Sequence, residues 1–133
     1  MVALGDGEEK SNLKDLIISL NLTSSVVLAG HVFDIENYFK YARLCVVSSR
    51  IEGFPNVLLE MMQYNSNILS TLCAGDIKNI PGITTCKSND VNDLYKKMNN
   101  NLSLPKTLNN TNKVKSFLKQ RSIDEFMKSI DMN

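Results

Sequence analysis

Two carboxylates, Glu52 and Glu60, lie eight positions apart on either side of Pro55. Carboxylates accept hydrogen bonds from vicinal hydroxyl groups, such as those of a sugar or a ribose. Glu60 stands among Val, Leu and Met residues, and a buried carboxylate without a partner is costly. We therefore expect a ligand or partner at Glu60, with a solvated helix face as the alternative. Glu52 precedes the helix and fits either a ligand contact or a solvated loop.

The residues between these two acids predict a helix start that suits an anion. Pro55 fits the first helical position, because its missing N–H would have no partner there. Three amides then point out of the helix N-terminus, where the macrodipole favours phosphate. These amides belong to Asn56, Val57 and Leu58. Gly53 lets a ligand approach the backbone closely. The spacing thus places a diphosphate over the helix start, a sugar near Glu52 and a ribose near Glu60.

The elements that must position this stretch are short apolar runs that alternate with amphipathic segments. Strands are expected at residues 2–4, 26–29, 44–47, 68–71 and 83–86. Helices are expected at residues 13–20 and 35–42, from Pro55 onward, and at 91–100 and 112–129, with a short helical turn near residue 80. This alternation predicts an α/β fold with a parallel sheet and helices on both faces. Ligands of such sheets bind at the carboxyl ends of strands, where the Glu52 loop follows the run 44–47.

Composition fits a single domain at residues 1–133, because the 43% hydrophobic and 22% charged residues are ordinary for a globular protein. The net charge of +1 argues against nucleic-acid binding. The longest apolar runs are too short to cross a bilayer, and the first residues do not resemble a secretory signal. We therefore expect a cytoplasmic protein.

The cysteines and the histidine give no catalytic constellation. Cys45, Cys73 and Cys86 contain no closely spaced pair, so we expect reduced thiols, with a metal or nucleophile role as the minor alternative. His31 is the only histidine, which excludes a catalytic triad and a His-rich metal site. It fits a loop residue at a strand end or a residue that borders a ligand.

The segment from Ser49 to Glu60 closely resembles the E-x7-E signature of family 4 (group 1) retaining glycosyltransferases, which have the GT-B fold. Three further segments resemble strand ends of the same family: residues 2–7 with Gly-Asp-Gly, residues 26–31, and residues 67–75. The resemblance covers roughly residues 1–100.

The resemblance implies a Rossmann-like C-terminal domain that binds a UDP- or GDP-sugar, without a metal or other cofactor. It implies that Glu52 is catalytic and contacts the donor sugar, and that Glu60 binds the ribose. The residues implied to face sugar and diphosphate are Glu52, Gly53, Phe54, Asn56, Val57 and Leu58. Backbone near His31 and Val32 would border the base. A complete enzyme would transfer the sugar with retention, in cell-envelope polysaccharide or glycolipid synthesis.

Departures from the family pattern qualify this reading. Asn65 stands where a glycine is often found, and an asparagine can still adopt a left-handed conformation there. The family's first strand, its basic pair for the diphosphate and its N-terminal domain have no counterpart before Val2. We therefore expect a partial donor-binding domain, in which the strands at 2–4 and 44–47 flank an empty slot and lower the stability.

Several interpretations stay open. The chain fits a fragment whose N-terminal half is separately encoded, a non-catalytic nucleotide-sugar-binding module, or an inactive remnant. Phe54 fits a packing residue or a stacking platform, and Arg50 fits a phosphate contact or a solvated charge. The basic helix is expected to be a solvated face, with peripheral contact to the inner face of a membrane as the alternative. Its cations are Lys113, Lys115, Lys119 and Arg121.

Overall fold

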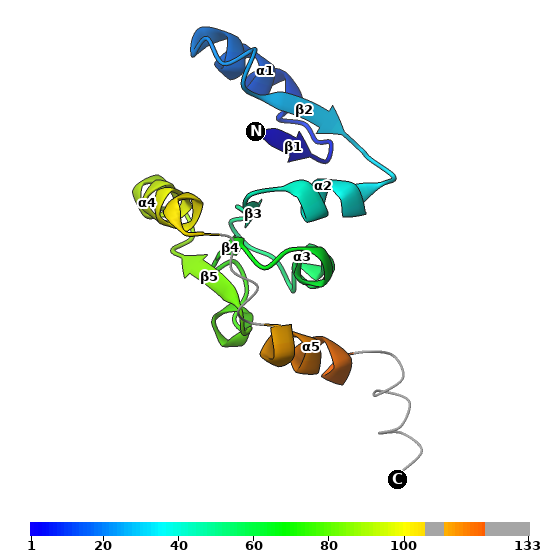
Figure 1. Cartoon of the computed structure of the whole chain (residues 1–133). Helices are drawn as coiled ribbons and strands as arrows, with labels where there is room; N and C mark the ends of the chain where they lie inside the picture. Colours follow the sequence, from blue (N-terminus) through cyan, green and yellow to red (C-terminus); the bar gives the residue numbers. More distant parts are fainter. Residues whose placement is uncertain (106–110, 122–133) are drawn as a thin grey trace. The chain divides into compact units, whose positions relative to one another are not determined.

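A computed structural model describes residues 1–105 and 111–121, in which strands and helices alternate (Figure 1). All strand pairs are parallel, so the predicted α/β class is confirmed. The chain divides into two compact units, Met1–Ile35 and Glu36–Asn133. Two such units can belong to one domain, and the expected single domain stays a prediction.

The N-terminal unit contains β1 (Val2–Leu4), α1 (Lys10–Ser19) and β2 (Val27–Gly30). The two strands form a parallel pair in which Val2 lies opposite Val27 and Ala3 opposite Leu28. The Gly5 amide continues this pairing with a 2.8 Å hydrogen bond to the Gly30 carbonyl. Both glycines have positive φ angles, +108° and +67°, which glycine adopts without the steric cost of a Cβ.

The apolar face predicted for the first helix forms, but it is not buried in this unit. No residue of α1 is buried, and Leu13, Leu16 and Leu20 are exposed. Val27 is exposed as well, so β2 is not covered on both faces as expected. The expectation of burial was wrong here because a two-stranded sheet offers little apolar surface to cover a helix.

The C-terminal unit holds a three-stranded parallel sheet in the order β3-β4-β5. Its elements are α2 (Ile35–Tyr41), β3 (Cys45–Val47), α3 (Asn56–Tyr64), β4 (Ile68–Thr71), the 3₁₀ turn η1 (Ile77–Asn79), β5 (Ile83–Cys86), α4 (Val91–Ser103) and α5 (Thr111–Gln120). The strands agree with the apolar runs of the sequence. The helix expected at 112–129 appears as α5, and residues 122–129 lie outside the described residues.

Apolar side chains around the central strand form the core of this unit. All four residues of β4 are buried, and Leu58 of α3 and Ile77 of η1 are fully enclosed. Cys45, Cys73 and Cys86 are buried thiols that form no disulfide with one another, as expected for reduced cysteines. Burial raises the pKa of the Cys86 thiol, which disfavours its reactive thiolate form.

Asn65 connects the ends of two helices. Its backbone is extended, with φ −139° and ψ 144°, so it does not use the left-handed conformation open to an asparagine at this position. Its side-chain amide donates to the carbonyls of Phe39 and Ala42 at 2.6 and 2.8 Å, and its oxygen accepts from the Asn67 amide at 2.8 Å. These bonds satisfy carbonyls at the end of α2 and hold the residue in its extended conformation.

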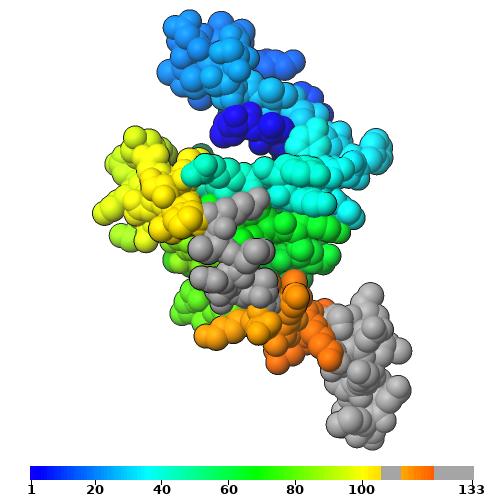
Figure 2. Space-filling model, in the orientation of Figure 1, coloured from blue at the N-terminus to red at the C-terminus, as the bar shows by residue number. Residues whose placement is uncertain are grey.

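The two C-terminal helices described lie at the surface of the same unit, where α4 is yellow and α5 is orange in Figure 2. The described residues contain no helix with the length and apolar character needed to span a membrane.

Candidate functional site

The loop between β3 and α3 is fastened to the loop that follows β4. The Glu52 amide donates a 2.9 Å hydrogen bond to the Cys73 carbonyl. Thr71, the last residue of β4, donates its hydroxyl to the Ser49 carbonyl at 2.5 Å. Because β3 and β4 are parallel neighbours, both bonds lie at the carboxyl end of the sheet, where ligands of α/β folds bind.

Glu52 has an oriented side chain. One of its carboxylate oxygens accepts a hydrogen bond from the Ser49 hydroxyl, and the residue is partly exposed. A carboxylate has about four acceptor positions on its two oxygens, so this single bond leaves capacity for ligand hydroxyls. The arrangement therefore presents a negatively charged acceptor in a fixed loop.

The start of α3 differs from the sequence prediction by one position. Pro55 is the N-cap, with an extended ψ of 91°, and the helix begins at Asn56. The Pro55 carbonyl accepts a 2.9 Å hydrogen bond from the Leu58 amide. The prediction that Leu58 offers a free amide was therefore wrong. Asn56 and Val57 supply the first two helical amides. Amides at the start of a helix have no carbonyl of the same helix as a partner.

Glu60 is exposed, so its apolar neighbours in the sequence do not enclose it. Leu58, Met61 and Met62 are buried on one face of α3, and helical periodicity places Glu60 on another face. The inference that burial forces a ligand on Glu60 was wrong in its premise. The exposed carboxylate is nevertheless accessible to a ligand in solution.

Glu60 belongs to an acidic surface that also contains Glu36 and Tyr64. A hydrogen bond with the Glu36 carboxylate raises the Tyr64 pKa, and partial burial and the charges of Glu36 and Glu60 raise it further. The raised pKa of the phenol is thus due first to Glu36, and the charge of Glu60 adds the smallest part.

Gly53 and its neighbours leave room above the loop. Apart from the adjoining residues, a Cβ placed on Gly53 would meet no atom of residues 1–105 and 111–121 within 4 Å. Arg50 and Ile51 on the same loop are exposed. The described part of the chain therefore leaves space in which a ligand could approach the Gly53 backbone.

Phe54 packs against a residue from the far end of the described chain. The Arg121 guanidinium lies 5.1 Å from the centre of the Phe54 ring and 4.7 Å from that of Phe117 in α5. Sequence reasoning treated Arg121 as part of a solvated helix face and missed this contact. No local pattern could reveal it, because the partners are 67 positions apart (121 minus 54).

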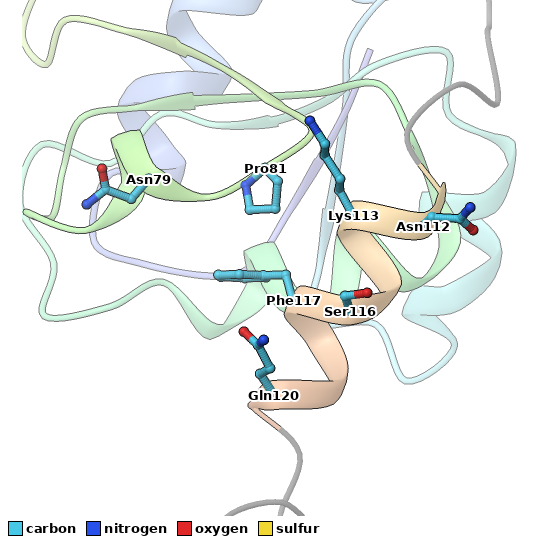
Figure 3. A pocket seen from close by; sticks show the side chains of 7 residues that line it. All are labelled: Asn79, Pro81, Asn112, Lys113, Ser116, Phe117 and Gln120. Carbon is cyan, nitrogen blue, oxygen red and sulfur yellow. The ribbon is translucent and has the colours of Figure 1, made fainter.

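A cavity of about 500 Å³ lies beside α5 in the same unit. Figure 3 shows the side chains that line it, Asn79, Pro81, Asn112, Lys113, Ser116, Phe117 and Gln120. None of them belongs to the loop or helix that carries Glu52 and Glu60. Phe117 connects the two regions, because its ring lines the cavity and also contacts Arg121.

His31 and Val32 follow β2 in the N-terminal unit, where His31 is exposed and Val32 is half-buried. The prediction that they border a base stays a prediction. In the same unit, Lys10 forms a 3.0 Å ion pair with Asp6. The hydrogen bond from Lys10 is the largest of the causes that lower the Asp6 pKa. Across residues 1–105 and 111–121, no three His, Cys, Asp or Glu side chains gather into a metal site.

Comparison with known families gives a match over most of the chain. Residues 1–103 match the family model described as "Glycosyl transferases group 1".

Relatives and a solved structure agree with that match. An uncharacterized glycosyltransferase of Methanocaldococcus jannaschii is 38% identical over 73 residues, 55% of this chain and 18% of the relative. The Campylobacter jejuni N-acetylgalactosamine-N,N'-diacetylbacillosaminyl-diphospho-undecaprenol 4-alpha-N-acetylgalactosaminyltransferase is 39% identical over 74 residues, 53% of this chain and 20% of the relative. Sucrose-phosphate synthase of Thermosynechococcus elongatus superposes with a TM-score of 0.80 at 21% identity, covering 98% of this chain and 37% of that one.

Proposed function

Because the chain belongs to the group 1 glycosyltransferases, we propose that its C-terminal unit binds the sugar and diphosphate of a nucleotide-sugar donor. The predicted family and the GT-B fold class are confirmed by the family match and by the likeness to sucrose-phosphate synthase. The observation that carries the proposal is the fastened Glu52 loop at the carboxyl end of the sheet, directly followed by the start of α3.

Glu52 is assigned to the donor sugar. Its amide is held by the Cys73 carbonyl and its carboxylate by the Ser49 hydroxyl, so the side chain needs little ordering when a ligand arrives. Hydroxyl groups of the sugar donate to the remaining acceptor positions of the carboxylate. In a complete enzyme this contact would place the sugar for transfer with retention, and Glu52 is the catalytic candidate.

The first turn of α3 is assigned to the diphosphate. The amides of Asn56 and Val57 and the helix macrodipole favour negative charge at this point. The leaving diphosphate gains charge during sugar transfer, so the same donors stabilise the transition state more than the ground state. Gly53 and Phe54 complete this segment, and the open space at Gly53 admits the ligand. Leu58 contributes through packing, because its amide already bonds within the turn.

Glu60 is assigned to the ribose. It lies on α3 four residues beyond Asn56, about 6 Å along the axis at the usual helical rise. Its exposed carboxylate accepts hydrogen bonds from the two vicinal hydroxyls. A role of the backbone at His31 and Val32 in binding the base stays an expectation from the family resemblance.

Acceptor binding and transfer are assigned to polypeptide beyond this sequence. The chain spans about a fifth of the length of the curated relatives reported above. The remainder belongs either to the same protein or to a separately encoded chain. The acceptor class that fits the Campylobacter relative's name is a lipid-linked sugar, which would bring the enzyme to a membrane surface.

Calorimetric titration of the chain with UDP- and GDP-sugars tests the proposal. Saturable binding that is weakened by Glu60→Ala is expected. Absence of binding to every such donor overturns it.

A further inference from the structure

Arg121 occupies an unusual position for a surface cation. It follows α5 and is itself exposed, yet its guanidinium lies within 5.1 Å of two aromatic ring centres, those of Phe54 and Phe117. Cation–π contacts extend to about 6 Å and hold a guanidinium in place. The side chain is therefore fixed against the loop residue that directly follows Gly53.

The chemistry left to this guanidinium is that of an anion ligand. Its N–H groups lie in the guanidinium plane and donate in a fixed fork that matches phosphate oxygens. Within the residues that the structure describes, no carboxylate forms an ion pair with Arg121. None of the carboxylates in that part of the chain neutralises its charge, and the guanidinium lies beside Phe54.

The charge balance of the loop calls for a cation where a diphosphate would bind. Glu52 and Glu60 each add negative charge to the site, and a nucleoside diphosphate brings more. Charge of that sign at the loop requires cations to offset the repulsion. Arg50 is exposed on the loop, whereas Arg121 is held beside it by aromatic contacts.

We propose that Arg121 binds the diphosphate of the donor and supplies positive charge to the site from the end of α5. This inference rests on the proposed donor site and adds a residue that the sequence motif does not contain. Phe54 and Phe117 act as positioning residues for Arg121, because their rings hold its guanidinium.

Calorimetric titration of the full chain with UDP, GDP and the corresponding monophosphates tests the inference. Arg121→Gln should weaken UDP or GDP binding about tenfold, the range of one charge-assisted hydrogen bond, with a much smaller effect on the monophosphate. Lys119→Gln is the matched control, because it removes the same charge from an exposed position two residues earlier. It should change affinity less than about twofold. Arg121→Lys keeps the charge but loses the forked donor geometry, so its affinity for UDP or GDP should lie between those of the unchanged chain and Arg121→Gln.

The outcomes separate the two proposals. Equal effects of Arg121→Gln and Lys119→Gln, with Glu60→Ala still weakening binding, overturn the role of Arg121 and leave the donor site standing. Equal losses of diphosphate and monophosphate affinity in Arg121→Gln also overturn it, because they indicate a general effect on the fold. If the unchanged chain binds neither UDP nor GDP, the donor site and the role of Arg121 both fail.

Discussion

The Glu52 amide and the Cys73 carbonyl form a 2.9 Å hydrogen bond that joins the loops after two adjacent parallel strands. Thr71 and Ser49 add a second bond between the same segments. A loop held in this way loses little conformational freedom on binding, so more of its interaction energy appears as affinity. These two hydrogen bonds are present in the folded chain without a ligand.

Gly53→Ala should reduce donor binding without disturbing the fold. Among the residues that the structure describes, the added methyl group meets no atom within 4 Å beyond the adjoining residues, and Gly53 has no positive φ that only glycine tolerates. The methyl group instead fills space assigned to the ligand, so we expect about tenfold weaker binding, or 1.4 kcal/mol. Gly7→Ala is the control, because Gly7 is equally unobstructed and lies outside the site. Matching affinities in the two variants would contradict the assigned space.

The free energy of unfolding should depend strongly on Leu58 and little on Leu16. Leu58 has 0% of its surface exposed, whereas Leu16 on α1 is 52% exposed. Leu58→Ala creates a cavity and should cost about 2–5 kcal/mol of unfolding free energy. Leu16→Ala should change it by less than about 0.5 kcal/mol. Urea unfolding followed by circular dichroism measures both, and a large loss in Leu16→Ala would show that the α1 face is covered in solution.

Local unfolding should require less free energy in the N-terminal unit than in the C-terminal unit. Among the described residues β1 pairs only with β2 and β3 only with β4, so each sheet ends at a strand edge. No residue of α1 is buried, whereas all of β4 is. Amide hydrogen exchange should therefore be fastest in β1 and β2 and slowest in β4. Uniform protection, together with one cooperative melt at high temperature, would contradict this account.

The phenol of Tyr64 should titrate above its ordinary value of 10.0, because its hydrogen bond with Glu36 favours the neutral form. A pKa raised in the folded state adds stability that is fully present below pH 10 and is lost as the pH rises through the folded pKa. Absorbance titration of the tyrosinate should show the late component, absent in Tyr64→Phe. Glu36→Gln should lower the Tyr64 pKa. An unchanged titration in that variant would exclude the Glu36 contact.

The sequence predicted the strands and the position of the Glu52 loop well, because both depend on local composition. Runs such as 68–71 are apolar, short and bounded by turn residues, and these features hold whatever lies nearby. The predicted start of α3 at Pro55 was wrong by one residue, because a proline suits both the N-cap and the first helical position. Exposure was harder to predict. Glu60 has apolar neighbours along the chain, but its exposure depends on which face of α3 meets the sheet.

Contacts between distant segments could not be predicted at all. Asn65 bonds to carbonyls at the end of α2, and that tertiary contact decides its backbone conformation. Arg121 reaches Phe54 only because α5 returns to the loop. A single sequence carries no periodicity or spacing that encodes such pairs.

The central claim is that the segment from Glu52 to Glu60 binds a nucleotide-sugar, and calorimetric titration with UDP- and GDP-sugars tests it most directly. Glu60→Ala should weaken binding at least tenfold, as expected for loss of hydrogen bonds to a charged group. The same variant should leave the unfolding free energy within about 0.5 kcal/mol, because Glu60 is exposed. Glu8→Ala, which removes an exposed carboxylate outside the site, should leave affinity unchanged. Affinity that is the same in Glu60→Ala and the unchanged chain would contradict the claim.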